Sequence, residues 1–152
     1  MVGSIKIDLI ADCKQLILAK IDTANEAIQL AEEALLSDTK SSAGDKFETG
    51  REMAQQEISR TKRILLESQH QLFQIKQLEA AVTPAPKVQA GSLIITNQGM
   101  FFLGVSLGMV LSNTNQVMVI STVSPMGKIL LGKKVGEGFD FLHKNFQILE
   151  IH

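Results

Sequence analysis

The chain has 152 residues, of which 45% are hydrophobic and 20% charged, and its formal net charge is −1. This composition excludes chain-wide disorder and a general polyanion binder held by phosphate contacts alone. A single cysteine, Cys13, excludes an internal disulfide, and three scattered histidines offer no zinc-ligand spacing. Asp8 interrupts the apolar start, and the longest apolar stretch, 100–111, is too short to span a bilayer. We therefore expect a cytoplasmic protein with no membrane partner.

Residues 1–83 are predicted to form two long helices that pack along an apolar seam. Small and aliphatic residues recur at alternating spacings of about three and four, which is typical of a coiled coil. In the first helix only Lys14 interrupts this spacing. In the second, from about Glu48 to Ala81, softer seam positions fall at Thr61, Ser68 and Glu79. The seam residues are Ile10, Ile17, Ile21, Ala24, Ile28, Ala31 and Leu35, then Ala54, Ile58, Leu65, Leu72, Ile75 and Val82.

The two helices are joined by the small polar segment 37–44, SDTKSSAG, which cannot continue the seam. A short polar turn between two long helices predicts an antiparallel helical hairpin. About 30 residues at ~1.5 Å each would make an arm of roughly 45 Å. We expect this arm to project from the rest of the molecule.

A proline pair at Pro84 and Pro86 separates this hairpin from the rest of the chain. The segment TPAPK reads as a short stiff linker, because proline fixes φ and disfavours helix in the residue before it. Residues 1–83 carry 10 Lys and Arg against 13 Asp and Glu, a net of −3, whereas 84–152 carry 5 against 3, a net of +2. The expected division is 1–83, a linker at 84–87, and a second domain at 88–152.

The second domain is predicted to be a small antiparallel sheet with one short helix. Strands are expected at 92–96 and 100–105 around a turn at 97–99, and at 116–122. Ser124 and Pro125 form a helix start, with an N-cap serine and a proline at the first helical position, and Gly132 ends that helix. A closing hairpin joins 138–142 to 146–151 through 143–145. The whole chain is therefore expected to be α+β.

Three stretches of the sequence resemble the bacterial transcript cleavage factors GreA and GreB. Residues 120–137, ISTVSPMGKILLGKKVGE, are similar to the signature of the family's C-terminal domain, and 88–92, VQAGS, to its entry. Residues 44–48, GDKFE, resemble the tip of its coiled coil. The sequence departs from the family pattern between Ser92 and Ile120, where MFFLGVSLG replaces a charged version, and at the tip, where Lys46-Phe47 and 49–51 differ. The resemblance implies a helical hairpin followed by an FKBP-like domain.

The resemblance also implies a function that depends on another machine. Factors of this family bind RNA polymerase, insert the coiled-coil tip into its secondary channel and stimulate Mg²⁺-dependent cleavage of backtracked RNA at its 3′ end. Asp45 and Glu48 match the tip carboxylates that would hold a Mg²⁺ shared with the polymerase, so no metal is expected in the free protein. Phe47 at the tip, and Ser124, Pro125 and Lys128, are the expected partner contacts. Such a protein is a cofactor of the polymerase's own activity and is expected to be a monomer when free.

Each of these sites also has a purely structural interpretation. Asp45 and Glu48 have the spacing of a capping box, and Ser124-Pro125 is an ordinary helix start. The second helix also carries a basic group, which suits ion pairs with acids along the helix as well as contacts to RNA: Arg51, Arg60, Lys62 and Arg63.

Two other functions remain open. One is a channel-binding regulator that does not cleave. The other is a peptide-binding or prolyl isomerase-like module, which rests on fold analogy alone and lacks Trp and Tyr for an aromatic pocket.

Overall fold

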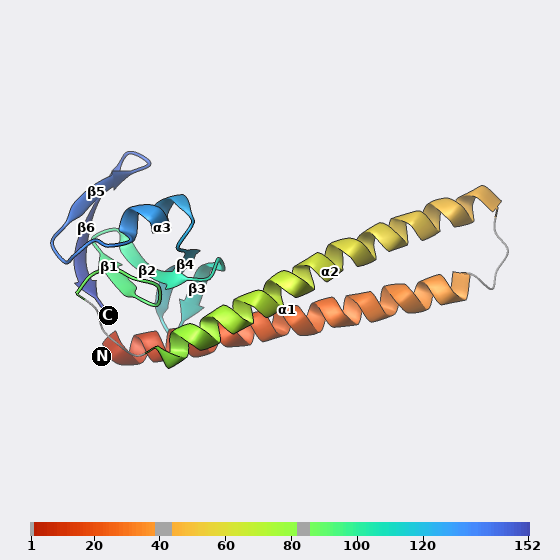
Figure 1. Ribbon diagram of the computed structural model, residues 1–152, viewed down its shortest axis with the longest axis horizontal. Coiled ribbons are helices and arrows are strands. Elements are labelled where there is room, and N and C mark those ends of the chain that lie inside the picture. The colour runs from red at the N-terminus through yellow and green to blue at the C-terminus, as the bar shows by residue number, and fades with distance from the viewer. Residues whose placement is uncertain (1, 39–43, 82–85) are drawn as a thin grey trace. The chain divides into compact units, whose positions relative to one another are not determined.

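The computed structural model describes residues 2–38, 44–81 and 86–152, with side chains at 4–37, 49–81 and 86–152. Within these residues, two long helices precede a six-stranded sheet that carries one short helix (Figure 1). The expected α+β class and helical hairpin are confirmed. The helices are α1 (Val2–Asp38), α2 (Gly44–Ala80) and α3 (Pro125–Leu130), and the strands are β1 (Leu93–Thr96), β2 (Gly99–Gly104), β3 (Gly108–Ser112), β4 (Asn115–Ser121), β5 (Gly138–Phe141) and β6 (Lys144–Ile151).

The chain divides into two compact units, one of which is formed by two separate runs of sequence. One is the middle of the helix pair, 16–72, and the other combines 1–15 with 73–152. The first residues of α1, up to 15, and the last residues of α2, from 73, therefore belong to the same unit as the sheet. Part of the expected linker at 84–87 lies outside the described residues, so the division into 1–83 and 88–152 stays a prediction.

The unit 16–72 is held together by the predicted seam. Ile17 is fully buried, and the seam positions of α2 include two polar residues, Thr61 and Ser68, that are also buried. The hydroxyl of Thr61 donates to the backbone carbonyl of Glu57 at 2.8 Å, which satisfies it inside the helix. The remaining buried apolar side chains of this unit are Ala24, Ile28 and Ile58.

The seam continues into the second unit and explains the interruption at Lys14. Ile75, a predicted seam residue, is fully buried there, and so is Cys13. Lys14 Nζ lies 3.0 Å from an oxygen of Glu79, another soft position of the predicted seam. A charge in the seam of α1 is thus matched by an opposite charge in the seam of α2. The predicted seam residue Val82 lies outside the described residues.

The sheet is mixed, which corrects the expectation of an antiparallel sheet. Its strand order is β3-β4-β2-β1-β6-β5, and β2 pairs with β4 in parallel while every other pair is antiparallel. The parallel pair arises because β3 pairs on the outer side of β4. The segment between β2 and β4 therefore serves as the crossover that a parallel pair requires.

Two details of the strands also differ from expectation. The sequence of β3, GMVLS, does not predict a strand, because it lacks the alternation of apolar and polar residues that marks a half-buried strand. In the structure Val110 and Ser112 are buried, and Met109 and Leu111 are exposed. The turn between β5 and β6 is Leu142-His143 rather than 143–145. Both residues have positive φ, 50° and 64°, as a two-residue type I′ turn requires.

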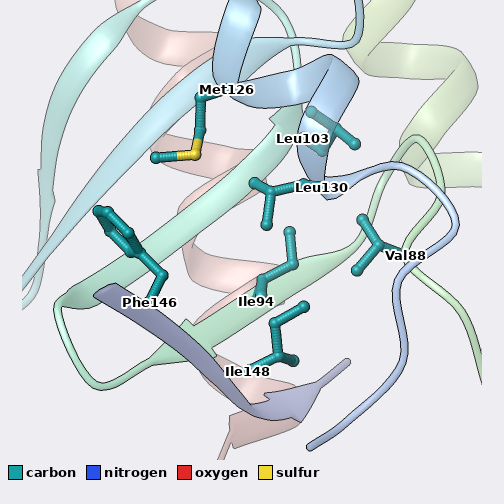
Figure 2. Close-up of a cluster of buried hydrophobic side chains, with 7 residues drawn as sticks. All are labelled: Val88, Ile94, Leu103, Met126, Leu130, Phe146 and Ile148. Atoms are coloured by element: carbon teal, nitrogen blue, oxygen red, sulfur yellow. The ribbon is translucent and has the colours of Figure 1, made fainter. Parts of the chain in front are cut away.

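One face of the sheet packs against α3 and forms a continuous apolar core. Met126 and Leu130 project from α3 toward Ile94 and Ile148 of the sheet (Figure 2). The cluster is completed by Val88, Leu103 and Phe146, all buried. Burial of these side chains fixes α3 on the sheet.

The opposite face of the sheet is covered from the helix ends in the same unit. Leu93, Phe102 and Val119 are fully buried on that face, in a row given by the strand register. A Cβ on Gly104 would lie 2.7 Å from Cδ1 of Leu78, so α2 approaches the backbone of β2 closely.

The other helix also reaches the sheet, through hydrogen bonds at the turn between β3 and β4. The side chain of Ser112 donates to Asp12 at 2.5 Å, and that of Asn113 donates to Asp8 at 3.0 Å. Two carboxylates of α1 therefore hold this turn in place.

Candidate partner-binding site

The first turn of α3 is stabilised by Ser124, whose hydroxyl makes two hydrogen bonds. Ser124 has extended backbone, φ −67° and ψ 157°, and Pro125 occupies the first turn of the helix. The Ser124 hydroxyl accepts from the backbone N–H of Gly127 at 3.0 Å and donates to the carbonyl of Ser121 at 2.7 Å. The predicted helix start is confirmed, and the cap also ties α3 to the end of β4.

Gly127 allows α3 to lie against the end of β4. A Cβ at this position would lie 2.1 Å from the carbonyl oxygen of Ser121 and 2.8 Å from Oγ of Ser124. No side chain fits there without displacing backbone. The glycine of the SPMGK motif is therefore required by packing.

The three expected contact residues of α3 are not equally available to a partner. Pro125 and Lys128 are exposed, whereas Ser124 is half-buried and its hydroxyl is occupied by the cap. Among the described residues Lys128 makes no ion pair. Val123, just before the helix, is 73% exposed. The surface at the start of α3 thus combines an apolar patch with one free positive charge.

An apolar groove of about 380 Å³ lies on the α3 side of the sheet. Its walls are mainly methionine and phenylalanine, side chains that adapt to irregular apolar partners. Lys144 is its one charged lining residue. No local sequence pattern identifies this groove, because its lining residues come from six elements and two turns that only the strand order brings together. The lining residues are Gln98, Gly99, Met100, Phe101, Met109, Gln116, Met118, Met126, Phe141, Leu142, Lys144 and Phe146.

Two of the groove's three phenylalanines, Phe101 and Phe146, are held by ring contacts. Phe139 stacks on Phe146 at 5.1 Å between ring centroids, and Phe101 meets Phe146 edge-on at 6.0 Å. Lys133 Nζ lies 5.8 Å from the ring centre of Phe139, within the range of a cation–π contact. Packed rings lose little freedom on binding, so they make a preorganised wall for an apolar side chain.

The expected metal ligands lie at the start of α2, where only the backbone is described. Asp45, Phe47 and Glu48 belong to α2, which begins at Gly44, and their side chains lie outside the described residues. Asp45 is the second residue of α2, and both the capping role and the metal-binding role of Asp45 and Glu48 stay predictions. Elsewhere in the described residues, no three His, Cys, Asp or Glu side chains gather as metal ligands.

The basic group on α2 is partly paired within the helix. Arg60 hydrogen-bonds Glu57 at 2.8 Å, and this bond lowers the pKa of the exposed Glu57 carboxyl. Lys62 lies 3.9 Å from Glu32 of α1. Helix-surface pairing thus accounts for two of the four basic residues. Arg51 and Arg63 make no ion pair with a described residue.

Comparison with protein families, with curated proteins and with solved structures finds no match to this chain. In the described residues, no helix combines the length and the apolar character needed to cross a membrane.

Proposed function

We propose that this protein is a transcription elongation factor similar to GreA and GreB, which binds RNA polymerase and stimulates cleavage of backtracked RNA. The observation that carries the proposal is the combination of a long helical hairpin with a C-terminal sheet whose short helix has the family's SP start. Each helix of the hairpin has 37 residues, or about 55 Å. That length suits a part that reaches into a channel of another molecule.

The sheet domain would supply binding to the polymerase. Pro125 and Lys128 are exposed on α3, and the apolar groove is lined by Met126 of the same helix. An exposed cation on a helix that contributes to an apolar groove supports docking of a protein surface that presents both an apolar side chain and an acid.

The tip of the hairpin would supply the chemistry. Asp45 and Glu48 belong to the first residues of α2, and carboxylates are the ligands that Mg²⁺ prefers, so the donor set fits this ion. A second Mg²⁺ beside the one held by the polymerase would stabilise the attacking and leaving oxygens of the cleaved phosphodiester. Asp45 is assigned as the closer ligand, and Glu48 as the group that supports the metal or positions water. The catalytic centre belongs to the polymerase, and this chain contributes ligands to it.

The test is RNA cleavage in a backtracked complex of the cognate polymerase, with and without the protein. Asp45→Asn should lower the stimulated rate by at least about tenfold, because it removes the charge that holds the metal. It should still compete with the wild type for the polymerase. Glu48→Gln should lower the rate less. Glu52→Gln, a change of the same type at an exposed position of α2, serves as the matched control and should cleave normally.

The same assay separates the proposal from a non-cleaving regulator. A protein that binds the polymerase but leaves the cleavage rate unchanged would overturn transcript cleavage and favour occlusion of the channel. Failure to bind the polymerase at all would overturn both.

Docking is tested separately by the half-saturating concentration. Lys128→Ala should raise it without lowering the cleavage rate at saturation, because the change removes binding alone. Lys128 is the better choice over Ser124, since Ser124 also caps α3. A lower rate at saturating Lys128→Ala would contradict this division of labour.

A further inference from the structure

The strand β3 forms an open edge of the sheet with exposed apolar side chains. It lies at one end of the strand order, and within the described residues no strand pairs with it on the side away from β4. Met109 and Leu111 are 56% and 64% exposed on the α3 side, while Val110 and Ser112 are buried on the other. The outward N–H and C=O groups of β3 can therefore accept a further strand.

The opposite edge of the sheet, β5, differs from β3 because it carries charged residues, which protect an edge from pairing. β5 carries Asp140 and is followed by Lys144, and charges of this kind discourage pairing with another chain. No charged residue stands anywhere between Lys87 and Lys128, so β3 and both of its flanking turns carry none. The nearest carboxylates that the structure records, Asp8 and Asp12, are already hydrogen-bonded to side chains of the β3–β4 turn.

We propose that β3 pairs with β3 of a second copy of this chain, antiparallel and about a two-fold axis at Val110. The sequence of β3, GMVLS, has the same character in both directions: small, large apolar, β-branched, large apolar, small. An antiparallel two-fold contact requires such a self-complementary strand. In this register Met109 of one copy faces Leu111 of the other, twice.

The pairing is weak, and it goes beyond the proposed function without depending on it. Five residues a side bury less surface than the roughly 1,200–2,000 Å² of a stable interface. Dimers therefore form at high protein concentration, while the monomer expected from the sequence persists at low concentration.

Sedimentation equilibrium between about 10 µM and about 1 mM tests the association, since a weak dimer dissociates in this range. The wild-type mass should rise from monomer toward dimer. The double variant Met109→Lys/Leu111→Lys places like charges opposite each other and should raise the dissociation constant at least about tenfold. Val135→Lys is the control, because Val135 is also 56% exposed but lies outside β3. A monomeric wild type throughout, or equal weakening by both variants, would overturn the proposal.

The register is tested by mixing Met109→Cys with Leu111→Cys, because both positions are exposed. In the proposed register these two cysteines of different copies would face each other across antiparallel strands, about 4.5–5.5 Å apart at Cα, which suits a disulfide. Oxidised glutathione accepts the electrons: each disulfide formed between two copies reduces it to two glutathione thiols. Met109→Cys alone faces Leu111 and should cross-link at least about tenfold more slowly than the mixture.

The native cysteine, Cys13, does not contribute to this cross-linking. Cys13 is fully buried, and burial raises the pKa of its thiol to about 11, which keeps it protonated and unreactive. Equal cross-linking by the mixture and by Met109→Cys alone would show that the strands do not meet about Val110.

Discussion

The hairpin seam and the contact between α3 and β4 place opposite demands on their residues. The seam accepts polar and charged side chains: Thr61 is buried with its hydroxyl bonded to its own helix, and Lys14 pairs with Glu79. The α3 contact accepts no added atom, because a Cβ on Gly127 would lie 2.1 Å from the Ser121 carbonyl. A repeating helix pair spreads its packing over many equivalent positions, whereas the approach of α3 to the end of β4 depends on Gly127.

This difference indicates which substitutions should change the stability of the protein most. A helix surface can relax along its length, and its polar groups find partners one turn away. A six-residue helix fixed by its cap, by the close approach at Gly127 and by two buried side chains has no such freedom.

The largest effect is expected at Gly127. Gly127→Ala should destabilise the protein by about 3 kcal/mol, because the new methyl group forces α3 off β4. Gly50→Ala is the matched control: a Cβ there meets nothing within 4 Å, so alanine should stabilise α2 by about 0.5–1 kcal/mol. Urea unfolding followed by circular dichroism measures both. Equal effects of the two changes would contradict the contrast.

A pH dependence is expected from the buried thiol of the seam. The pKa of Cys13 is raised to about 11 from a reference value of 9.0, mainly by burial and then by the charge of Asp12. The unfolded chain therefore ionises first as pH rises, and the stabilisation, fully present below pH 9, is lost between pH 9 and 11. The loss should reach about 2–3 kcal/mol. Cys13→Val should flatten this part of the pH curve, and an unchanged curve would exclude Cys13 as its source.

A smaller effect is expected at the cap of α3. Ser124→Ala should cost about 1–2 kcal/mol, because the N–H of Gly127 loses its acceptor. Lys128→Ala, an exposed change in the same helix, should leave stability within about 0.5 kcal/mol. Thermal unfolding of both variants checks this. A large loss for Lys128→Ala would mean that its side chain is structural and unsuited to test docking.

The smallest effect is expected in the seam. Thr61→Val removes the hydrogen bond to the Glu57 carbonyl but keeps the side-chain volume, and should change stability by less than about 0.5 kcal/mol. Urea unfolding is again the measurement. A loss of several times that amount would show that the seam is as demanding as the α3 contact.

Sequence spacing predicted the hairpin because a helix seam is a local property. Residues three and four apart meet on one face, so the buried positions Ile17, Ala24 and Ile28 could be identified from spacing alone. The start of α3 was predicted for the same reason, since Ser124 and Pro125 act within one helical turn. The tip residues Asp45 and Glu48 remain predictions, because their side chains are outside the described residues.

The order of the strands was decided only in three dimensions. No local pattern indicates that β4 inserts beside β2 and leaves β3 at the edge, because strand pairing joins residues far apart in the chain. That order creates the groove, which gathers Met100, Met118 and Phe146 from three strands. The sequence alone therefore determined the elements whose signals lie within a turn or a repeat, and the tertiary structure decided the surfaces, because these depend on long-range neighbours.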